Sequence, residues 1–406
     1  MRAIKAQYFL AFAVMGSLLP YLSVVLKRRG LTDPQVADVQ FTTGLAIFLT
    51  PAVLGLLADT KVENRTILGT MFLVGSIGLG GMLSAEGFWP LMLTHAVYAL
   101  AIFPLMPMQD GLLFRYQQQT GHTGSYHRVR VYGTVGFIVP SLVLYVALAW
   151  GAPLASALVV AIGCCGLGAL NSLRLPAVRD GAGRPLEAGR EVPEPEEDED
   201  EQATAGSKLP TVQALRTMLQ PRVLVFCIGM WLFQLIAACY YSYYPLYLTD
   251  LLGVEEKWIG LIANIGVVLE IFFMLSFGWL VARIGLRGVM VLGSLATMVR
   301  LGLLFAFPMV VIGIATQLFH GLQVLVLHVG PPVFLNAKAG PSFRSSMQGL
   351  YAMLVLGSGR MLGFIFAGRV SNISLTAVFA YGASLALVAT LLFAVAVHRS
   401  EKAGAS

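Results

Sequence analysis

The sequence contains few charged residues. Only 12% of its 406 residues are Asp, Glu, Lys or Arg, whereas 57% are hydrophobic, and the mean hydropathy is +0.76. About 25% of a typical soluble domain is charged, so this composition excludes a soluble protein and indicates a polytopic membrane protein. Short alternating strands are also lacking. The apolar residues instead form continuous runs of about 20 residues, which predicts membrane-spanning helices and not a β-barrel.

Cysteine is scarce, and the motifs of common enzyme active sites are missing. No CxxC motif occurs, and all the cysteines lie within apolar runs: Cys164, Cys165, Cys227 and Cys239. Neither a disulfide framework nor a zinc site is therefore expected. The sequence has no P-loop, GxSxG or HExxH motif. We expect no enzymatic activity, no ATP-driven pumping, no cofactor and no metal.

The apolar runs predict an all-α membrane protein with twelve transmembrane helices. The first run follows basic residues, as in a signal peptide, but it is long enough to span and is expected to be the first helix. The predicted spans lie at approximately 4–26, 36–58, 66–84, 88–110, 130–149, 153–173, 222–248, 257–281, 288–306, 308–334, 346–369 and 374–397.

The positions of the basic residues predict the topology. The two termini and the even-numbered loops contain 20 of the 27 Lys and Arg residues, whereas the odd-numbered loops contain 5. By the positive-inside rule, both termini are cytoplasmic. We expect a multi-pass protein of the cell inner (cytoplasmic) membrane, surrounded by the lipid bilayer. The pI of about 9.2 reflects this topology, so nucleic acid is not an expected partner.

Two similar segments indicate an internal repeat. Residues 55–65 (GLLADTKVENR) and 278–287 (GWLVARIGLR) each place a glycine four residues before a turn position and then basic residues. We interpret them as equivalent parts of two six-helix halves, 1–173 and 222–406. Each is expected to form a cytoplasmic gating loop, with Gly55 and Asp59 in one and Gly278 and Arg283 in the other. Topology alone could also produce this pattern.

The predicted halves are joined by a polar segment, 174–221. It contains GRPLEAGREVPEPEEDEDEQATAGSKLP, in which proline, glycine and a run of acidic residues predominate. Such a segment cannot bury a core, so a cytoplasmic, acidic, disordered linker is predicted. Binding of a partner protein is the alternative role.

A single acidic residue lies deep within a predicted span. Glu270 precedes Arg283 by 13 residues, or roughly 20 Å of helix, which places it near the bilayer centre. A carboxylate there is costly unless it has a partner or takes a proton, so proton coupling is the functional hypothesis, and a purely structural pair is the alternative. Arg300 in the ninth span is the expected counter-ion, because a guanidinium cannot neutralise itself.

The tenth span has a polar face. Gln317, His320 and Gln323 are spaced three residues apart and therefore share one broad face, with His328 further round the helix. A histidine near the middle of the membrane can change its charge near neutral pH and could relay a proton to a carboxylate. A hydrogen-bonded packing role for His320 is the alternative.

Other polar residues in the spans are candidates for substrate contacts. Gln234 and Tyr241 share a helix face in a tyrosine-rich segment, which could stack on a substrate ring or form an interfacial belt. Asp110 and Arg130 could form an ion pair or a substrate clamp, or could be two charges at helix ends. The predicted substrate-binding residues are Asp110, Arg130, Gln234, Tyr241, Gln317, Gln348 and Arg360.

Several segments resemble the major facilitator superfamily. They include YFLAFAVMGSLLPYLSVVL, PLMPMQD, VRVYGTVGFI, GVVLE, MVRLG, QLFHGLQVLVLH and MQGLYAMLVLGSG, in this order. In detail they are similar to the branch that contains the bacterial 3-phenylpropionate transporter and relatives of the nucleoside and oligosaccharide proton symporters. The resemblance implies the twelve-helix major facilitator fold with two six-helix halves.

The resemblance also implies roles for individual residues. In lactose-permease-like symporters, a glutamate, an arginine and a histidine of the second half serve proton coupling and sugar affinity. These positions correspond to Glu270, Arg300 and His320, and the sugar-binding pair of the first half corresponds to Asp110 and Arg130. The sequence departs from that pattern at Gln323, where the permease has a further glutamate. It departs again at position 282, an alanine where the loop motif often has aspartate.

The expected function is secondary active transport. We expect a monomeric proton-coupled symporter that moves a small organic solute, either an aromatic acid, a nucleoside or a sugar, by alternating access. Efflux by proton antiport is one alternative. A non-transporting sensor or assembly protein built on a transporter scaffold is another, for which the acidic linker is the sequence support.

Overall fold

The computed structural model describes residues 1–58, 62–120, 126–176, 210–340 and 343–397. Within these ranges the chain is helical and contains no β-strand. Helices follow from the long apolar runs, because a spanning helix satisfies all its backbone hydrogen bonds without water. The helices of the first part are α1 (Arg2–Leu18), α2 (Leu22–Arg28), α3 (Asp33–Ala58), α4 (Asn64–Ser84), α5 (Phe88–Ile102), α6 (Leu105–Thr120), α7 (Tyr126–Ala149) and α8 (Ser156–Ser172).

The second part contains more interrupted helices. Short 3₁₀ and π segments, labelled η, separate several of them. In chain order the elements are α9 (Pro210–Met218), α10 (Pro221–Leu246), η1 (Tyr247–Leu251), η2 (Glu256–Trp258), α11 (Ile259–Ala306), α12 (Val310–Ala315), η3 (Thr316–Phe319), α13 (His320–Val324), η4 (Leu325–Val329), α14 (Gly330–Asn336), α15 (Arg344–Tyr351), η6 (Ala352–Gly357), α16 (Ser358–Ser371) and α17 (Leu375–Ala396).

Nine helices of the described ranges are long and apolar enough to cross a membrane, or ten if α1 and α2 form one span. These two helices meet at an angle of 42°. Pro20 lies in the break, where its missing N–H removes a helical hydrogen bond. The apolar helix α8 has 17 residues and is shorter than a typical span.

A sharp kink divides α11, which has 48 residues. Gly285 lies at the kink with φ 70° and ψ 166°, a backbone conformation that is essentially confined to glycine. The segment 278–287 therefore changes the direction of the chain, and the predicted eighth and ninth spans lie on either side of Gly285.

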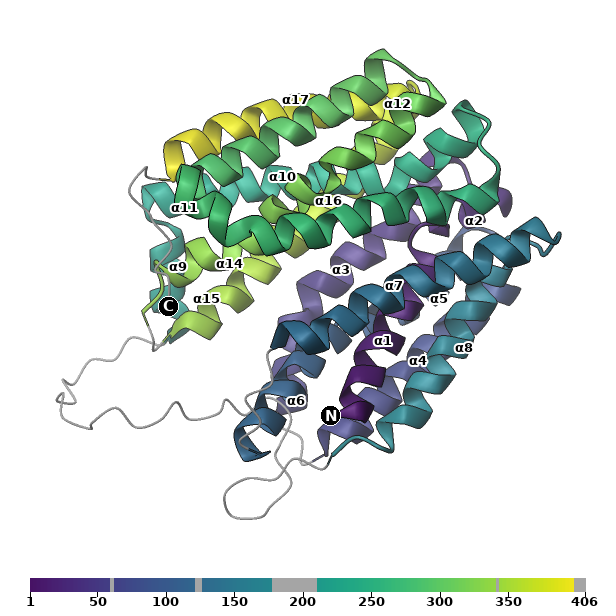
Figure 1. Cartoon of the computed structure of the whole chain (residues 1–406), viewed down its shortest axis with the longest axis horizontal. Helices are drawn as coiled ribbons and strands as arrows, with labels where there is room; N and C mark the ends of the chain where they lie inside the picture. Colours follow the sequence, from purple (N-terminus) through teal and green to yellow (C-terminus); the bar gives the residue numbers. More distant parts are fainter. Residues whose placement is uncertain (59–61, 121–125, 177–209, 341–342, 398–406) are drawn as a thin grey trace.

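The helices form two groups. Figure 1 shows α1 to α8 in one group and α10 to α17 in the other. The two groups lie close together at the end of the bundle near α2 and diverge toward the opposite end, where the N-terminus and the end of α17 lie. We call these the loop end and the terminal end of the bundle.

Polar contacts join the two groups at the loop end. Arg28 Nε lies 2.7 Å from Glu256 Oε1, and Arg28 Nη1 lies 3.3 Å from Asp250 Oδ1. The Tyr243 hydroxyl donates to the backbone oxygen of Asp33 at 2.9 Å. We call Arg28, Asp250 and Glu256 the latch, because they link the end of α2 to the segment between α10 and α11.

Further contacts lie between the latch and the middle of the bundle. The Ser242 hydroxyl donates to Gln40 Oε1 at 3.1 Å, and Asn264 Nδ2 donates to the Ile138 oxygen at 3.4 Å. Between described residues, no hydrogen bond or ion pair joins the two groups at the terminal end. The structure is therefore closed at the loop end.

The groups also touch where α3 crosses η6 and α16. A Cβ atom at Gly44 would lie 2.6 Å from the Met361 nitrogen, and one at Gly357 would lie 2.5 Å from the Phe48 backbone. Both distances are too short for a side chain, so glycine is what permits this close approach of two helices. The two groups are therefore packed closely along this line.

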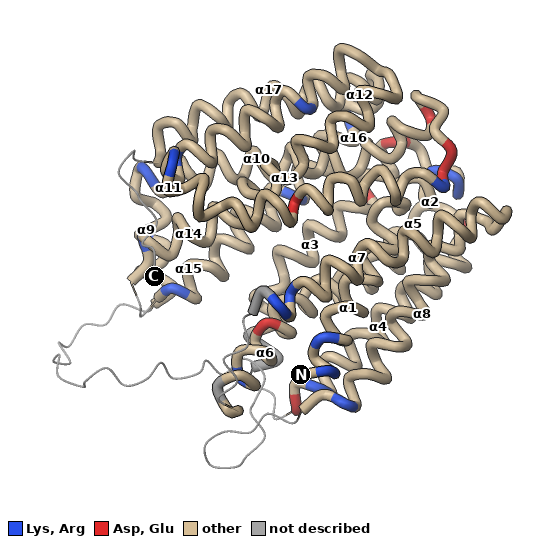
Figure 2. The backbone as a smooth tube through the Cα atoms, in the orientation of Figure 1, with Lys and Arg blue, Asp and Glu red and all other residues tan. Residues whose placement is uncertain are grey.

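Charged residues gather at the two ends of the bundle. Figure 2 shows lysines and arginines at the terminal end, mixed charges at the loop end and few charges between them. This is the distribution that the sequence predicts for helices that cross a membrane, since charges are costly in hydrocarbon.

One helix lies inside the segment that was expected to be a disordered linker. Residues 177–209 are outside the described ranges, but α9 is helical and packs on α10 and α15. Its buried residues, Ala214, Thr217 and Met218, follow one helix face. The prediction of a linker extending to residue 221 is therefore wrong for α9, because short apolar residues at helical spacing give this segment a face to bury.

Candidate functional site

The most buried charge in the described protein is the guanidinium of Arg300, on α11 beyond the kink. Its exposed fraction is 0%. Nη1 donates to Gln323 Oε1 at 2.7 Å and lies 3.1 Å from His320 Nδ1, while Nη2 donates to Gln317 Oε1 at 2.9 Å and to the Tyr240 hydroxyl. We call these five residues the Arg300 cluster. Four neutral partners surround one buried positive charge.

The Tyr240 side chain, on α10, contacts Arg300 in two ways. Its hydroxyl accepts hydrogen bonds from Arg300 and, at 2.9 Å, from Gln317 Nε2. Its ring also lies beneath the guanidinium, with Cζ 3.9 Å from the ring centroid, in a cation–π arrangement. These contacts stabilise the charge, but none of them supplies a negative charge.

Arg300 does not pair directly with Glu270. The expectation that it is the counter-ion of this acid is wrong, since no ion pair between described residues involves Arg300. Glu270 instead lies near His320, with 3.9 Å between Oε2 and Nε2. Neutral acceptors bond to both terminal nitrogens of the guanidinium, Nη1 and Nη2, whereas Nε is buried without a hydrogen-bond partner among the described residues. These neutral groups leave Glu270 outside the Arg300 cluster.

The geometry defines which nitrogen of His320 carries its proton. A guanidinium can only donate, so His320 Nδ1 must accept from Arg300, and the ring proton lies on Nε2. Nε2–H then faces Glu270 Oε2 across 3.9 Å, which is longer than a hydrogen bond. His320 is therefore neutral, and it lies between the buried arginine and the carboxylate.

Irregular helical segments position these side chains. The predicted common face of Gln317, His320 and Gln323 is confirmed, since all of them bond to Arg300. The 3₁₀ segment η3 precedes His320 and the π segment η4 follows Gln323 closely. Tight and wide turns of this kind are frequent at functional sites because they re-aim side chains that a regular α-helix would direct elsewhere.

A second arginine forms a separate polar contact. Arg360, on α16, donates from Nε and Nη2 to Gln234 Oε1 at 3.1 and 2.8 Å. Its Cζ lies 5.6 Å from the ring centroid of Tyr241. The predicted common face of Gln234 and Tyr241 on α10 thus faces α16. Arg360 is partly exposed, and its Nη1 makes no hydrogen bond to any described residue.

Charged side chains from both groups of helices lie at the boundary between the two groups. Glu270 lies within electrostatic reach of Arg130 on α7, and its side chain is 29% exposed. The exposed side chain of His328, on η4, lies within electrostatic reach of both Arg130 and Arg360. We call Arg130, Tyr241, Glu270, His328 and Arg360 the cross-half group. Its members are at the boundary between the two groups of helices, where a solute could contact both.

The predicted pair of Asp110 and Arg130 is not formed. Asp110, on α6, accepts a hydrogen bond from the Tyr8 hydroxyl of α1. Arg130 lies over the Phe12 ring, with 4.1 Å between Cζ and the ring centroid. In the part of the chain that the structure describes, no ion pair links these two residues. Asp110 bonds to a tyrosine and Arg130 lies over an aromatic ring, and we assign Arg130 to the cross-half group.

Gln348 lies apart from the other predicted substrate contacts. Its Nε2 donates to Asn336 Oδ1 at 3.0 Å in an exposed position. It precedes Arg360 by 12 residues, or roughly 18 Å of helix. The structure therefore places Gln348 near the terminal end, far from the cross-half group.

The predicted gating loops are only partly described. Gly55 lies within α3, and Asp59 lies outside the described residues. In the second loop, a Cβ atom at Gly278 would meet nothing within 4 Å, so packing does not require glycine there. Arg283 is exposed and lies over the Trp279 ring, with 5.4 Å between Cζ and the ring centroid. Gly285 is the residue of this segment whose conformation requires glycine.

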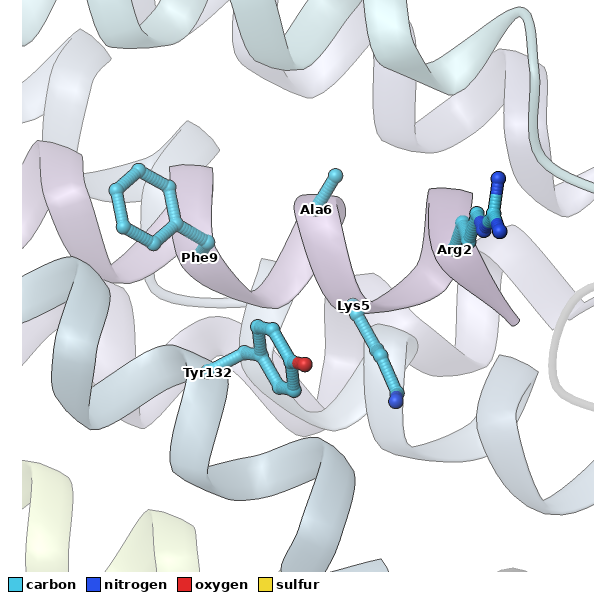
Figure 3. A pocket seen from close by; sticks show the side chains of 5 residues that line it. All are labelled: Arg2, Lys5, Ala6, Phe9 and Tyr132. Atoms are coloured by element: carbon cyan, nitrogen blue, oxygen red, sulfur yellow. The ribbon is translucent and has the colours of Figure 1, made fainter.

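A hollow near the N-terminus does not coincide with these clusters. It has a volume of about 460 Å³ and is lined by Arg2, Lys5, Ala6, Phe9 and Tyr132. Figure 3 shows these side chains along the first turns of α1 and on the adjacent α7. The Lys5 ammonium lies 5.0 Å from the centroid of the Tyr132 ring. The hollow is at the terminal end and contains none of the predicted site residues.

Two residues of the Arg300 cluster were missed by the sequence-based prediction of the site. In the sequence analysis Tyr240 appears only within a tyrosine-rich segment, and Gln323 appears on the polar face of the tenth span and as a departure from the permease pattern, but neither is assigned a role in the site. A usable signal was Arg300 itself. A buried guanidinium has five N–H donors, so it requires several acceptors and not a single carboxylate.

Comparisons with known proteins agree with this geometry. The model of the MFS_1 like family matches residues 1–381. The putative nucleoside transporter YegT of Escherichia coli K12 is 23% identical over 394 residues, which cover 92% of this chain and 84% of YegT. The nucleoside permease NupG of the same organism is 23% identical over 399 residues, covering 90% of this chain and 87% of NupG.

A third relative and a solved structure extend the likeness. A probable 3-phenylpropionic acid transporter of Escherichia coli K12 is 26% identical over 371 residues, covering 89% of this chain and 88% of that protein. The crystal structure of the nucleoside transporter NupG superimposes with a TM-score of 0.80 at 20% identity and covers 97% of this chain and 98% of that one. The chain belongs to the MFS_1 like family of the major facilitator superfamily and is a membrane transporter of small solutes, not an enzyme.

Proposed function

We propose that this protein is a proton-coupled symporter that moves a small organic solute by alternating access. The observation that carries the proposal is Glu270, a partly exposed carboxylate deep within a predicted span. It has no arginine or lysine ion-pair partner among the described residues. A carboxylate fixed in an ion pair would keep its charge. Glu270 can instead take up and release a proton without breaking such a pair.

The Arg300 cluster would serve as the fixed partner of Glu270. Arg300 cannot release its proton, and His320 is held in one tautomer by the bond to Nη1. The His320 Nε2–H can approach the Glu270 carboxylate when that group is charged and separate from it when the group is neutral. His320 therefore orients the acid, and Glu270 is the residue that carries the proton.

The substrate would lie between the two helix groups and contact the cross-half group. Tyr241 and Gln234 both contact Arg360, while Arg130 approaches from the other half. Gln317 is occupied by Arg300 and Tyr240, so it acts through them. Gln348 bonds to Asn336 near the terminal end, and Asp110 bonds to Tyr8 of α1. We therefore propose neither residue as a substrate contact.

We propose that the chain has twelve transmembrane helices and that both of its termini are cytoplasmic. We also propose that the protein lies in the cell inner membrane. Nine long apolar helices are candidate spans, and α11 is one of them. The number becomes twelve when α1 and α2 are counted as one further span, α8 as another, and α11 as two spans on either side of Gly285. The halves are 1–173 and 222–406, and the segment 174–221 joins them and includes α9. The protein is expected to act as a monomer.

The contacts between the halves support alternating access. The latch and the bonds of Tyr243 and Ser242 close the loop end, and no such bonds between described residues close the terminal end. With the termini in the cytoplasm, this is an inward-facing state. Transport to the opposite state requires the latch to open and the terminal end to close around the line where α3 meets η6 and α16.

The experiment is a measurement of external pH in lightly buffered, de-energised cells that express the protein. Aromatic acids, nucleosides and sugars are added singly, and Glu270→Gln is the matched variant. Alkalinisation with one compound, lost in the variant, is the expected result. Alkalinisation of equal size in the variant would overturn the role of Glu270. Acidification, or sensitivity to a toxic solute on deletion, would indicate efflux by antiport instead.

A further inference from the structure

The cross-half group and the Arg300 cluster together contain more positive than negative charge. Together they contain three guanidiniums, those of Arg130, Arg300 and Arg360, and one carboxylate, that of Glu270. None of the three takes part in an ion pair with another described residue. Even with Glu270 ionised, an excess of positive charge remains, and it grows when Glu270 takes a proton. A surplus of this kind in a low-dielectric interior is costly unless an anion binds there.

The arrangement at Arg360 leaves it ready to bind a ligand. Two of its nitrogen atoms share the single amide oxygen of Gln234, and the ring of Tyr241 supports one side of the guanidinium. Gln234 is 2% exposed, so this orientation is fixed by a buried residue. Nη1 is left without a described partner. An oriented guanidinium with free N–H groups is the preferred protein group for a carboxylate.

Arg130 approaches the same region from the other half. It lies over Phe12, as Arg360 does near Tyr241, and is partly exposed. The exposed His328 side chain lies within electrostatic reach of both arginines, which come from α7 and α16. The two guanidiniums therefore flank one region at the boundary of the halves. A small anion there would contact both halves, as a transported solute must.

We propose that the transported solute is an organic anion, whose carboxylate or comparable acid group binds between Arg360 and Arg130, and not a neutral nucleoside or sugar. This inference rests on the proposed function, since it names the substrate class of the same site. It resolves the choice among aromatic acid, nucleoside and sugar that the sequence leaves open. It also accounts for the lack of an ion pair between either arginine and any other described residue.

A consequence concerns the charge moved in each cycle. A monoanion that travels with one proton on Glu270 carries no net charge across the membrane. A neutral solute with one proton would carry one positive charge and would be driven by the membrane potential. Uptake of an anion by this protein should therefore depend on the pH gradient and be insensitive to the potential.

The first test measures binding to the purified, full-length protein in detergent without any gradient. The probes are monocarboxylates, each paired with its primary amide, for example benzoate with benzamide, and uridine as a neutral nucleoside. We expect a carboxylate of the panel to bind, and its amide to bind roughly 100-fold more weakly, because removing one partner of a desolvated charge pair has an effect of this order. Equal or tighter binding of the amide or of uridine, or no binding of any carboxylate to folded protein, would overturn the proposal.

Variants locate the anion. Arg360→Gln and Arg130→Gln should each weaken carboxylate binding by at least about tenfold and narrow the difference between acid and amide. Arg283→Gln is the control, since Arg283 is exposed and lies away from the cross-half group. Unchanged binding in both site variants would refute the position. The binding assay does not involve proton movement. A failure of proton coupling through Glu270 would therefore not change the binding result, and a failure of carboxylate binding would not decide whether Glu270 carries the proton.

Discussion

The latch at the loop end should control how often that end opens. Arg28 contacts Glu256 at 2.7 Å and Asp250 at 3.3 Å. The hydrogen bond to Glu256 and the charges of both acids outweigh partial desolvation and raise the pKa of Arg28 above its usual value, so Arg28 is charged at all physiological pH values. Arg28→Gln removes both ion pairs at once and keeps most of the side-chain volume.

The size of the effect of Arg28→Gln can be estimated from the solvent exposure of the three side chains in the latch. The side chains of Arg28, Asp250 and Glu256 are 50%, 23% and 30% exposed. Partly exposed ion pairs contribute about 0.2–1 kcal/mol each, so the latch stabilises the closed loop end by about 1 kcal/mol. Its loss should raise the ratio of open to closed molecules about fivefold, and high salt should reproduce part of the effect.

Distances between spin labels at Glu86 and Ile373, on the loop end of the two halves, would measure this ratio after the native cysteines are replaced. Lys257→Gln is the matched control, because Lys257 pairs with Glu255 within its own segment and does not join the halves. A shift toward longer distances in Arg28→Gln alone is expected. An unchanged distribution in Arg28→Gln, or an equal shift in the control, would refute the latch.

Two further predictions concern the site and the kink. Tyr240→Phe keeps the ring beneath Arg300 but removes the acceptor of two hydrogen bonds, so it should lower the free energy of unfolding of the purified protein by roughly 2 kcal/mol. The control is Tyr244→Phe, which loses one hydrogen bond to the Gly313 oxygen and should lower it by about 1 kcal/mol or less. Equal melting temperatures would contradict the importance of the charged network. Gly285→Ala should lower the free energy of unfolding by about 1–3 kcal/mol, because the backbone conformation at this position is unfavourable for a residue with a side chain. Gly278→Ala, on an open helix surface, should be neutral or slightly stabilising in the same thermal assay.

The parts of the structure that depend on local pattern could be predicted from the sequence. Runs of apolar residues gave the helices, and spacing alone placed Gln317, His320 and Gln323 on one face, which the structure confirms. The spacing of seven between Gln234 and Tyr241 also placed them on a common face, and both contact Arg360. Helical periodicity is a property of the chain itself, so no knowledge of the neighbouring helices was needed.

The partners of charged residues could not be predicted in this way. Arg300 and Glu270 have opposite charges at similar depth, yet Arg300 bonds to four neutral groups from α10, η3 and α13, because packing brings those acceptors closer. Asp110 likewise bonds to Tyr8, which is about a hundred positions away along the chain. Pairing depends on how helices distant in sequence rotate and cross, and the sequence of one chain does not contain that information directly.

The kink and the linker show a second limit. Gly285 was one glycine among 43, and its conformation is visible only because α11 turns there. In the linker, the acidic run obscured the short apolar face of α9, where Ala214 and Met218 pack on neighbouring helices. Composition averaged over a long segment conceals a short helix that depends on tertiary contacts for its stability.

The central claim is that Glu270 carries the coupling proton, and the most direct measurement compares two kinds of transport in proteoliposomes. For a substrate identified by binding, counterflow exchange at equal pH on both sides reports substrate movement without net proton transfer, whereas accumulation driven by an inwardly directed proton gradient requires coupling. The account predicts that Glu270→Gln retains counterflow and loses accumulation, while Glu255→Gln, an exposed acid that pairs with Lys257 within its own segment, retains both. Accumulation of normal size in Glu270→Gln would contradict the account.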